Sequence, residues 1–227
     1  MRKKWVILKS WYKAGVPIGI IIQKVWLEKI FYPLVGIIKM RRFGDFSIHP
    51  SSKILHPSYL STQGRLSVDR GVFIDPLCTS GVNFQGPVSI GMYTTILCTS
   101  VYASPGKGLT VGANVGLGTH SFYGCAGGIT IGNNVLVGNY VSFHSENHIF
   151  DNRERVIADQ GVTRKGIVVG NDCWIGAKST ILDGAIIGDG CVVAAGSVVR
   201  GEIPPFSVIG GIPAKVIKQR GPFDKTV

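Results

Sequence analysis

The sequence has little charge, few acidic residues and no long apolar run. Of its 227 residues, 16% are charged, and 24 Lys and Arg stand against 13 Asp and Glu. Within the apolar segment 1–42, the longest stretches without a charge, 14–23 and 30–38, are far shorter than the roughly 20 apolar residues that cross a bilayer. We therefore expect no membrane-spanning helix. A secretory signal is not expected either, because Lys13 and Lys24 bracket the apolar stretch and no small-residue cleavage site follows it.

Cysteines are few, and their spacing matches no zinc finger. The five lie at positions 78, 98, 125, 173 and 191, and their number is odd. Cys173 and Cys191 occupy equivalent positions in successive turns of the repeat described below. A bridge between them is therefore conceivable, but we interpret both as small, reduced residues of a wall. A reducing cytoplasm fits this pattern best.

The positive charge is concentrated near the N-terminus. Ten cations and one acid, Glu28, fall within the segment 1–42, so this segment carries +9 of the formal net charge of +11. The rest of the chain is nearly neutral, which argues against a nucleic-acid partner. The segment 1–42 is also apolar and aromatic. We expect one or two amphipathic helices in it, with Pro17 and Pro33 at starts or kinks.

Two interpretations of this basic segment are open. It could cap the open end of the fold that follows and hide unpaired strand edges there. It could also make a peripheral contact with anionic membrane lipids, since cations beside an apolar, tryptophan-rich surface suit that interface. Either role would leave the protein at the inner face of a membrane or free in the cytoplasm.

A repeat of six residues is the strongest pattern present. Thirty-one glycines suit a chain that turns corners often. Between 169 and 203, large apolar residues recur at a constant step of six, and a second residue, expected to clear a corner, follows each four positions later. The large residues are Val169, Ile175, Ile181, Ile187, Val193 and Val199, and the second residues are Cys173, Ser179, Ala185, Cys191, Ser197 and Ile203. The step fits neither a helix nor a lone strand, and it predicts a triangular parallel β-helix with about 18 residues per turn.

Upstream of 169 the same step is interrupted. It begins at Ile48 and loses phase in 65–77, where we expect an imperfect coil. The intervals from Ile90 to Val111 and from Val111 to Ile131 are each slightly longer than one regular turn. Short bulges are therefore expected near 104–108 and 125–128.

The interval from Phe143 to Val169 is much longer than one turn and has the wrong composition for a wall. It holds two of the five histidines and eight further charged residues. Because stacked turns offer only flat, repetitive faces, a solenoid uses such an excursion for function. We expect three parts: a helical segment 1–45, a coil 46–206 with an inserted catalytic loop 144–166, and a C-terminal strand and basic tail 207–227.

The repeats, the polar excursion and the ending GGIPAKVIK at 210–218 together resemble the hexapeptide acyltransferases, in particular the sugar O-acetyltransferases of surface-polysaccharide synthesis. The resemblance covers about residues 48–220. It implies an all-β solenoid, a left-handed parallel β-helix that forms a homotrimer with acetyl-CoA in the groove between two coils. It further implies acetyl transfer to a hydroxyl of a sugar or of a lipid-linked saccharide.

The resemblance also assigns a general base. In these enzymes it is a histidine of the excursion, and the run IGNNVLVGNYVSFHSENH at 131–148 puts His148 at that position. An imidazole, ordinarily with a pKa of about 6.5, can accept the proton of a sugar hydroxyl that attacks a thioester. His144 is the alternative base. Glu146 or Asp151 could orient the ring, and Asn147 is a candidate contact of the acceptor sugar.

For acetyl-CoA the resemblance implies six contact residues and no metal. They are Trp174, Ala177, Ala195, Arg200, Lys215 and Lys218. The two alanines are one predicted turn apart and should stack along the pantetheine arm. The tryptophan would lie beside the acyl group, or else would seal the trimer groove as an outward aromatic. The two lysines would meet the phosphates of the nucleotide as point charges, unless they belong to an ordinary solvated tail.

Three other functions stay open. The same coil hosts zinc carbonic anhydrases, for which His120, His144 and His148 are the tempting ligands. Equivalent points two turns apart should differ by about 36 residues, and the interval from His120 to His144 is well short of that. N-acetylation of an amino sugar or an antibiotic would use the same base as O-acetylation. A non-catalytic scaffold would leave the polar loop without a purpose.

Overall fold

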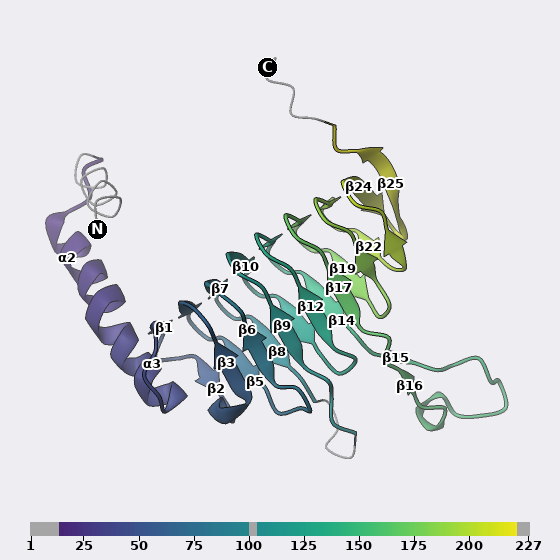
Figure 1. Cartoon of the computed structure of the whole chain (residues 1–227), viewed down its shortest axis with the longest axis horizontal. Coiled ribbons are helices and arrows are strands. Elements are labelled where there is room, and N and C mark those ends of the chain that lie inside the picture. Colours follow the sequence, from purple (N-terminus) through teal and green to yellow (C-terminus); the bar gives the residue numbers. More distant parts are fainter. Residues whose placement is uncertain (1–13, 100–103, 222–227) are drawn as a thin grey trace.

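The computed structural model describes residues 14–99 and 104–221 and is dominated by three ladders of short parallel strands. Figure 1 shows the strands stacked as successive turns of one coil, with the helices at the N-terminal end and a hairpin at the other. This architecture is a three-sided, left-handed parallel β-helix. The six-residue step predicts its three sides, and the resemblance to the hexapeptide acyltransferases implies its hand.

Each ladder forms one side of the coil. Sheet A contains β1 (Phe46–Ile48), β4 (Leu66–Val68), β7 (Val88–Ile90), β10 (Val115–Leu117), β13 (Leu136–Val137), β18 (Trp174–Ile175), β21 (Val192–Val193), β24 (Ser207–Gly211) and β25 (Ala214–Gln219). Sheet B contains β2 (Lys53–Ile54), β5 (Phe73–Asp75), β8 (Thr95–Leu97), β11 (Phe122–Gly124), β14 (Ser142–His144), β19 (Thr180–Leu182) and β22 (Val198–Val199). Sheet C contains β3 (Leu60–Thr62), β6 (Val82–Phe84), β9 (Leu109–Val111), β12 (Ile129–Ile131), β17 (Ile167–Val169), β20 (Ile186–Ile187) and β23 (Glu202–Ile203).

The regular repeat builds the core as the pattern predicts. Trp174 in β18 pairs with Val192 in β21, the equivalent position of the next turn. The six large residues at the step of six are buried, and so are the small corner residues that follow the first five of them. Ile203, the sixth of these second residues, is buried as well. It is not a corner residue, however, because it lies in β23 and pairs with Ile187 inside sheet C.

The coil is present in 65–77, where the apolar pattern loses phase, and it departs from a regular turn there, as expected. β4 and β5 both lie in that stretch, and each pairs with the strand before it and the strand after it. The difference from a regular turn is in the corners, because Leu66 pairs with Val88, which is further along the chain than a regular turn would place its partner. Longer corners change the spacing of inward residues without interrupting the ladders.

The assignment of Ile90 and Val111 to successive turns is also wrong. Ile90 pairs with Leu117 in sheet A, whereas Val111 lies in sheet C and pairs with Ile131. The extra residues of this turn lie between the end of β8 at Leu97 and the start of β9 at Leu109. The described residues 104–108 of this connection lie where the bulge is expected.

A continuous helical rod precedes the coil. It consists of α2 (Ile18–Trp26), the π-helical segment η1 (Leu27–Phe31) and α3 (Tyr32–Met40). Met40 is buried in the core of the coil. Lys39 Nζ donates to the carbonyl oxygen of Ser52 and Arg42 Nη2 to that of Leu60, both at 2.7 Å. α3 therefore caps the first turn, as the first interpretation of the basic segment has it.

Two further expectations can be compared with the structure. All five cysteines are buried and free, which confirms Cys173 and Cys191 as reduced wall residues. Burial raises the pKa of the Cys173 thiol to about 11. No helix within 14–99 and 104–221 has the length and apolarity needed to cross a membrane. Residues 1–13 of the basic segment lie outside the described residues.

Candidate active site

The polar excursion is an arm that extends away from its own coil. Residues 145–166, called the arm below, leave sheet B after β14 and re-enter sheet C at β17. Their two short strands, β15 (Asn147–His148) and β16 (Val162–Thr163), pair antiparallel, and a single 3-10 turn, η3 (Ile157–Asp159), lies between them. Figure 1 shows the arm projecting from the stacked turns. Three large apolar residues of the arm are exposed, namely Phe150, Val156 and Ile157.

His148 lies exposed on β15, where it pairs with Val162 across the hairpin. Neither ring nitrogen has a hydrogen-bond partner among the described residues. An imidazole in this state can accept a proton from an incoming hydroxyl. His144, the alternative base, lies on β14 with its ring against Phe122 at a centroid distance of 5.6 Å, and burial lowers its pKa.

Neither of the two carboxylates predicted to orient His148 bonds to its ring among the described residues. Glu146 accepts a hydrogen bond of 2.6 Å from Nε of Arg164, so its carboxylate is already engaged. Asp151 is exposed and makes no hydrogen bond with any described residue. The side chain of Asn147 is exposed next to His148, in a position compatible with contact to an acceptor.

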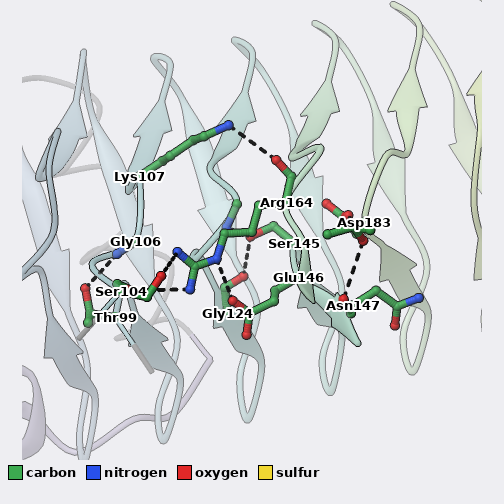
Figure 2. Close-up of polar contacts among 12 residues, drawn as sticks. Thr99, Ser104, Gly106, Lys107, Gly124, Ser145, Glu146, Asn147, Arg164 and Asp183 are labelled. Atoms are coloured by element: carbon green, nitrogen blue, oxygen red, sulfur yellow. Dashed lines mark hydrogen bonds and ion pairs between the residues drawn. The ribbon is translucent and has the colours of Figure 1, made fainter. Parts of the chain in front are cut away.

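Arg164 fixes the base of the arm to Ser104 and Pro105, in the connection that precedes β9. Besides bonding Glu146, Nη1 of Arg164 donates to Ser104 Oγ at 2.9 Å and to the Pro105 carbonyl at 3.2 Å, and Nη2 donates to the Ser104 carbonyl at 3.2 Å. Figure 2 shows the guanidinium of Arg164 between Ser104 and Glu146. The side chains of Arg164 and Glu146 are 19% and 23% exposed, so this ion pair is largely shielded from solvent. We call Arg164, Glu146, Ser104 and Pro105 together the Arg164 clamp.

A second set of contacts fixes the return strand. Asp183 accepts hydrogen bonds from Thr163 Oγ1 at 3.0 Å and from the backbone amides of Lys165 and Gly166 at 3.1 and 2.8 Å. Arg164 and Asp183 were not among the residues that the sequence singled out. The available signal was a pair of opposite charges near the two ends of the arm. Glu146 lies two residues after the end of β14, and Arg164 lies two residues before Gly166, the last residue of the arm.

Of the six expected cofactor residues, five lie on sheet A or at its corner with sheet B, and Arg200 lies at another corner. Ala177 and Ala195 stack at the corner between sheets A and B, where the Gly196 amide donates to the Ala177 carbonyl at 2.9 Å. Trp174 is exposed on the outer face of sheet A, and the lysines at 215 and 218 are exposed on β25, in the same sheet. Arg200 lies at the corner between sheets B and C, the corner from which the arm leaves. One chain alone does not bring Arg200 and His148 to the stacked alanines.

The zinc alternative lacks its ligand set. The ring of His120 lies between those of Tyr93 and Tyr140, at centroid distances of 5.1 and 4.9 Å, on a corner of the coil. His148 is on the arm. Within 14–99 and 104–221, no three His, Cys, Asp or Glu residues are arranged to hold a metal ion.

A groove on the described part of the chain lies elsewhere. It has a volume of about 850 Å³ and runs between α2 and the outer face of sheet A, from Ser47 to Leu136. Neither His148 nor any of the expected cofactor residues lines it. Size therefore does not identify the catalytic site in a single chain.

Comparison with known proteins shows which proteins the chain is similar to. Residues 166–201 match the family model of the bacterial transferase hexapeptide, six repeats. The match lies within the regular part of the three-sided coil, so the chain carries the repeat of these transferases there. A Mycobacterium tuberculosis protein named probable acetyltransferase is 32% identical over 168 residues, 74% of this chain and 54% of that protein. Galactoside O-acetyltransferase of Escherichia coli is 36% identical over 97 residues, 43% of this chain and 47% of that enzyme.

The chain thus spans about half the length of these curated relatives. Among solved structures, a mutant of AntD, an N-acyltransferase from Bacillus cereus in complex with dTDP and coenzyme A, superposes with a TM-score of 0.58. Its sequence identity is 18%, over 72% of this chain and 83% of that one. A likeness at this identity supports the fold alone.

Proposed function

We propose that this chain is an acetyl-CoA-dependent O-acetyltransferase that acetylates a hydroxyl of a sugar or a lipid-linked saccharide in surface-polysaccharide synthesis, in the cytoplasm. The observation that carries the proposal is an exposed, unpartnered His148 on an arm with a fixed base. The likeness to a galactoside O-acetyltransferase supports a hydroxyl acceptor.

In the proposed mechanism His148 is the general base. Bound acetyl-CoA supplies the acetyl group as a thioester. His148 removes the hydroxyl proton while the sugar oxygen bonds to the acetyl carbon and the carbon–sulfur bond breaks. The protonated ring then holds the proton that the departing sulfur needs. No covalent intermediate on the protein is required, because the hydroxyl attacks directly. Asn147, beside His148, is proposed to contact the acceptor.

The wall of sheet A fits a long, thin co-substrate. A Cβ added to Gly176 would lie 2.6 Å from the amide nitrogen of Ala195, so successive turns are in close contact at this corner and only small residues line it. We propose that Ala177 and Ala195 lie along the pantetheine arm and Trp174 beside the acyl group. The exposed Lys215 and Lys218 would bind phosphates, and Arg200 would make a polar contact from a neighbouring protomer.

We propose a homotrimer in which the arm of one protomer reaches the wall of the next. This arrangement would bring His148 to the stacked alanines, which lie at a different corner of its own coil, and would cover the exposed apolar residues of the arm. Mixing inactive His148→Ala and Ala177→Trp subunits tests it. If sites are shared, about a quarter of them regain both intact halves after random exchange. Activity that stays at zero would contradict shared sites.

Acceptor chemistry is decided by a direct assay. Thiol release from acetyl-CoA is followed across a panel of sugars and amino sugars, and the product is treated with hydroxylamine, which cleaves esters and leaves amides. Release with simple sugars and a hydroxylamine-labile product supports the proposal. A stable amide formed only with amino sugars would overturn O-acetylation in favour of N-acylation, the activity named for AntD.

A further inference from the structure

An apolar ridge runs along the outer side of the helical rod. Its residues occupy every fourth position from 18 to 38, and each is 49–75% exposed. They are Ile18, Ile22, Trp26, Ile30, Leu34 and Ile38. Exposed apolar residues are common singly, but a contiguous row of this size marks an interaction surface. We call this row the helix ridge.

The ridge stays on one side because of the π-helical segment. In an α-helix with 3.6 residues per turn, a step of four drifts by about 40° at each repeat, so five steps would carry the row half-way round the rod. The segment Leu27–Phe31 is π-helical and has wider turns, which reduces the drift in the middle of the row. The local geometry therefore keeps the apolar side chains together.

The coil does not cover the ridge. The side of α3 that caps the coil includes Gly36, where an added Cβ would lie 2.4 Å from Cβ of Phe46. The side of α2 that lines the large groove includes Gln23 and Leu27. None of the ridge residues lines that groove. Figure 1 shows the rod at the outer edge of the molecule, with α2 directed away from the strands.

Positive charge accompanies the ridge. Within the described part of the segment, Lys29 and Arg41 are exposed, and Glu28 is the one acid in the sequence from 1 to 42, against ten cations. We propose that the helix ridge lies in the interface of an anionic lipid bilayer, parallel to its surface, with the cations at the headgroups. Apolar burial and attraction to anionic lipid would both contribute to binding.

Charge also distinguishes this occupant from a second copy of the chain. A symmetric contact between two ridges would bring the exposed cations Lys29 and Arg41 of both copies into one interface, and like charges in contact oppose association. An anionic bilayer removes that repulsion and replaces it with attraction. Bound in this way, the rod would hold the coil and its arm beside the membrane.

Vesicle flotation of the full chain tests the proposal. Vesicles of phosphatidylcholine with about one third phosphatidylglycerol are compared with pure phosphatidylcholine at low and high salt. We expect the protein to float with the anionic vesicles, and less so at high salt. The triple variant Ile22→Ser, Ile30→Ser and Ile38→Ser should reduce binding at least tenfold. The control Ile212→Ser removes an isoleucine that is as exposed as Ile38 but lies at the far end of the coil. It should leave binding to the vesicles unchanged.

Two outcomes would overturn the proposal. If the triple variant floats as well as the unchanged protein, the ridge is not the lipid contact. If the unchanged protein fails to float and light scattering shows that the triple variant has a smaller mass, the ridge joins copies of the chain. Since flotation requires no acetyl transfer, these outcomes are independent of the proposed catalytic activity.

Discussion

Replacing Arg164 by Met perturbs the base of the arm and leaves the coil intact. Methionine has a similar length and packs adaptably, but it removes the charge and all the donors of the guanidinium. The variant loses the 2.6 Å bond to Glu146 and the three bonds to Ser104 and Pro105. It also leaves the carboxylate of Glu146 mostly buried without its cation.

The expected magnitude follows from these contacts. Removing one member of a buried ion pair costs about 3–5 kcal/mol, and the partial exposure of Arg164 and Glu146, 19% and 23%, favours the lower end. A local opening free energy lowered by about 3 kcal/mol raises the open population of the arm about a hundredfold. Because catalysis requires a positioned base, we expect kcat to fall at least tenfold, with little change in the melting temperature of the coil.

Amide hydrogen exchange and thiol release together test this prediction. Exchange of the arm amides between Asn147 and Thr163 should accelerate in Arg164→Met and stay unchanged in Arg153→Met, a control on the same arm whose side chain makes no hydrogen bond with a described residue. Adding Glu146→Leu should recover part of the loss, because no carboxylate is then stranded. Normal exchange and turnover in Arg164→Met would refute the clamp.

Three further predictions concern the coil and its cap. Tyr123→Phe should raise the melting temperature, since the hydroxyl is buried without a hydrogen-bond partner and such a group costs about 1–3 kcal/mol; a lower melting temperature would contradict this. Gly36→Ala should destabilise the cap through its clash with Phe46, whereas Gly19→Ala, with open space around it, should be neutral or slightly stabilising; equal melting temperatures would count against the cap. Burial raises the pKa of Cys173 from 9.0 to about 11. The stability that the protonated thiol contributes is therefore present below pH 9 and lost as pH rises through about 11. Denaturant melts of the unchanged protein and of Cys173→Ala, measured as a function of pH, should differ in pH dependence only within that window.

Much of the fold was predictable because the repeat encodes it locally. Residues at a step of six, such as Ile175 and Ile181, alternate with corners and point inward in every turn, so their spacing specifies the coil. Corner lengths are not encoded in this way. The long connection between Leu97 and Leu109 lengthens a turn, and this shifted the expected partner of Ile90 from Leu117 to Val111.

The polar excursion was predictable from its composition, but the contacts that fix it to the coil were not. Polar residues in 144–166 indicated a segment outside the wall. The contact of Arg164 with Ser104 joins positions 60 residues apart, and such a pairing leaves no periodic signal in the sequence. For the same reason, the sequence suggested Glu146 as a partner of His148. In the structure, the carboxylate of Glu146 is bonded to Arg164, on the returning side of the arm.

The most direct test of the account is thiol release from acetyl-CoA by His148→Ala, measured beside Arg153→Ala with the acceptor that the panel identifies. Loss of a general base lowers turnover by about two to four orders of magnitude. We expect such a loss in His148→Ala, with unchanged folding, and near-normal turnover in Arg153→Ala. Undiminished turnover in a folded His148→Ala protein would contradict the assignment of the arm as the catalytic element.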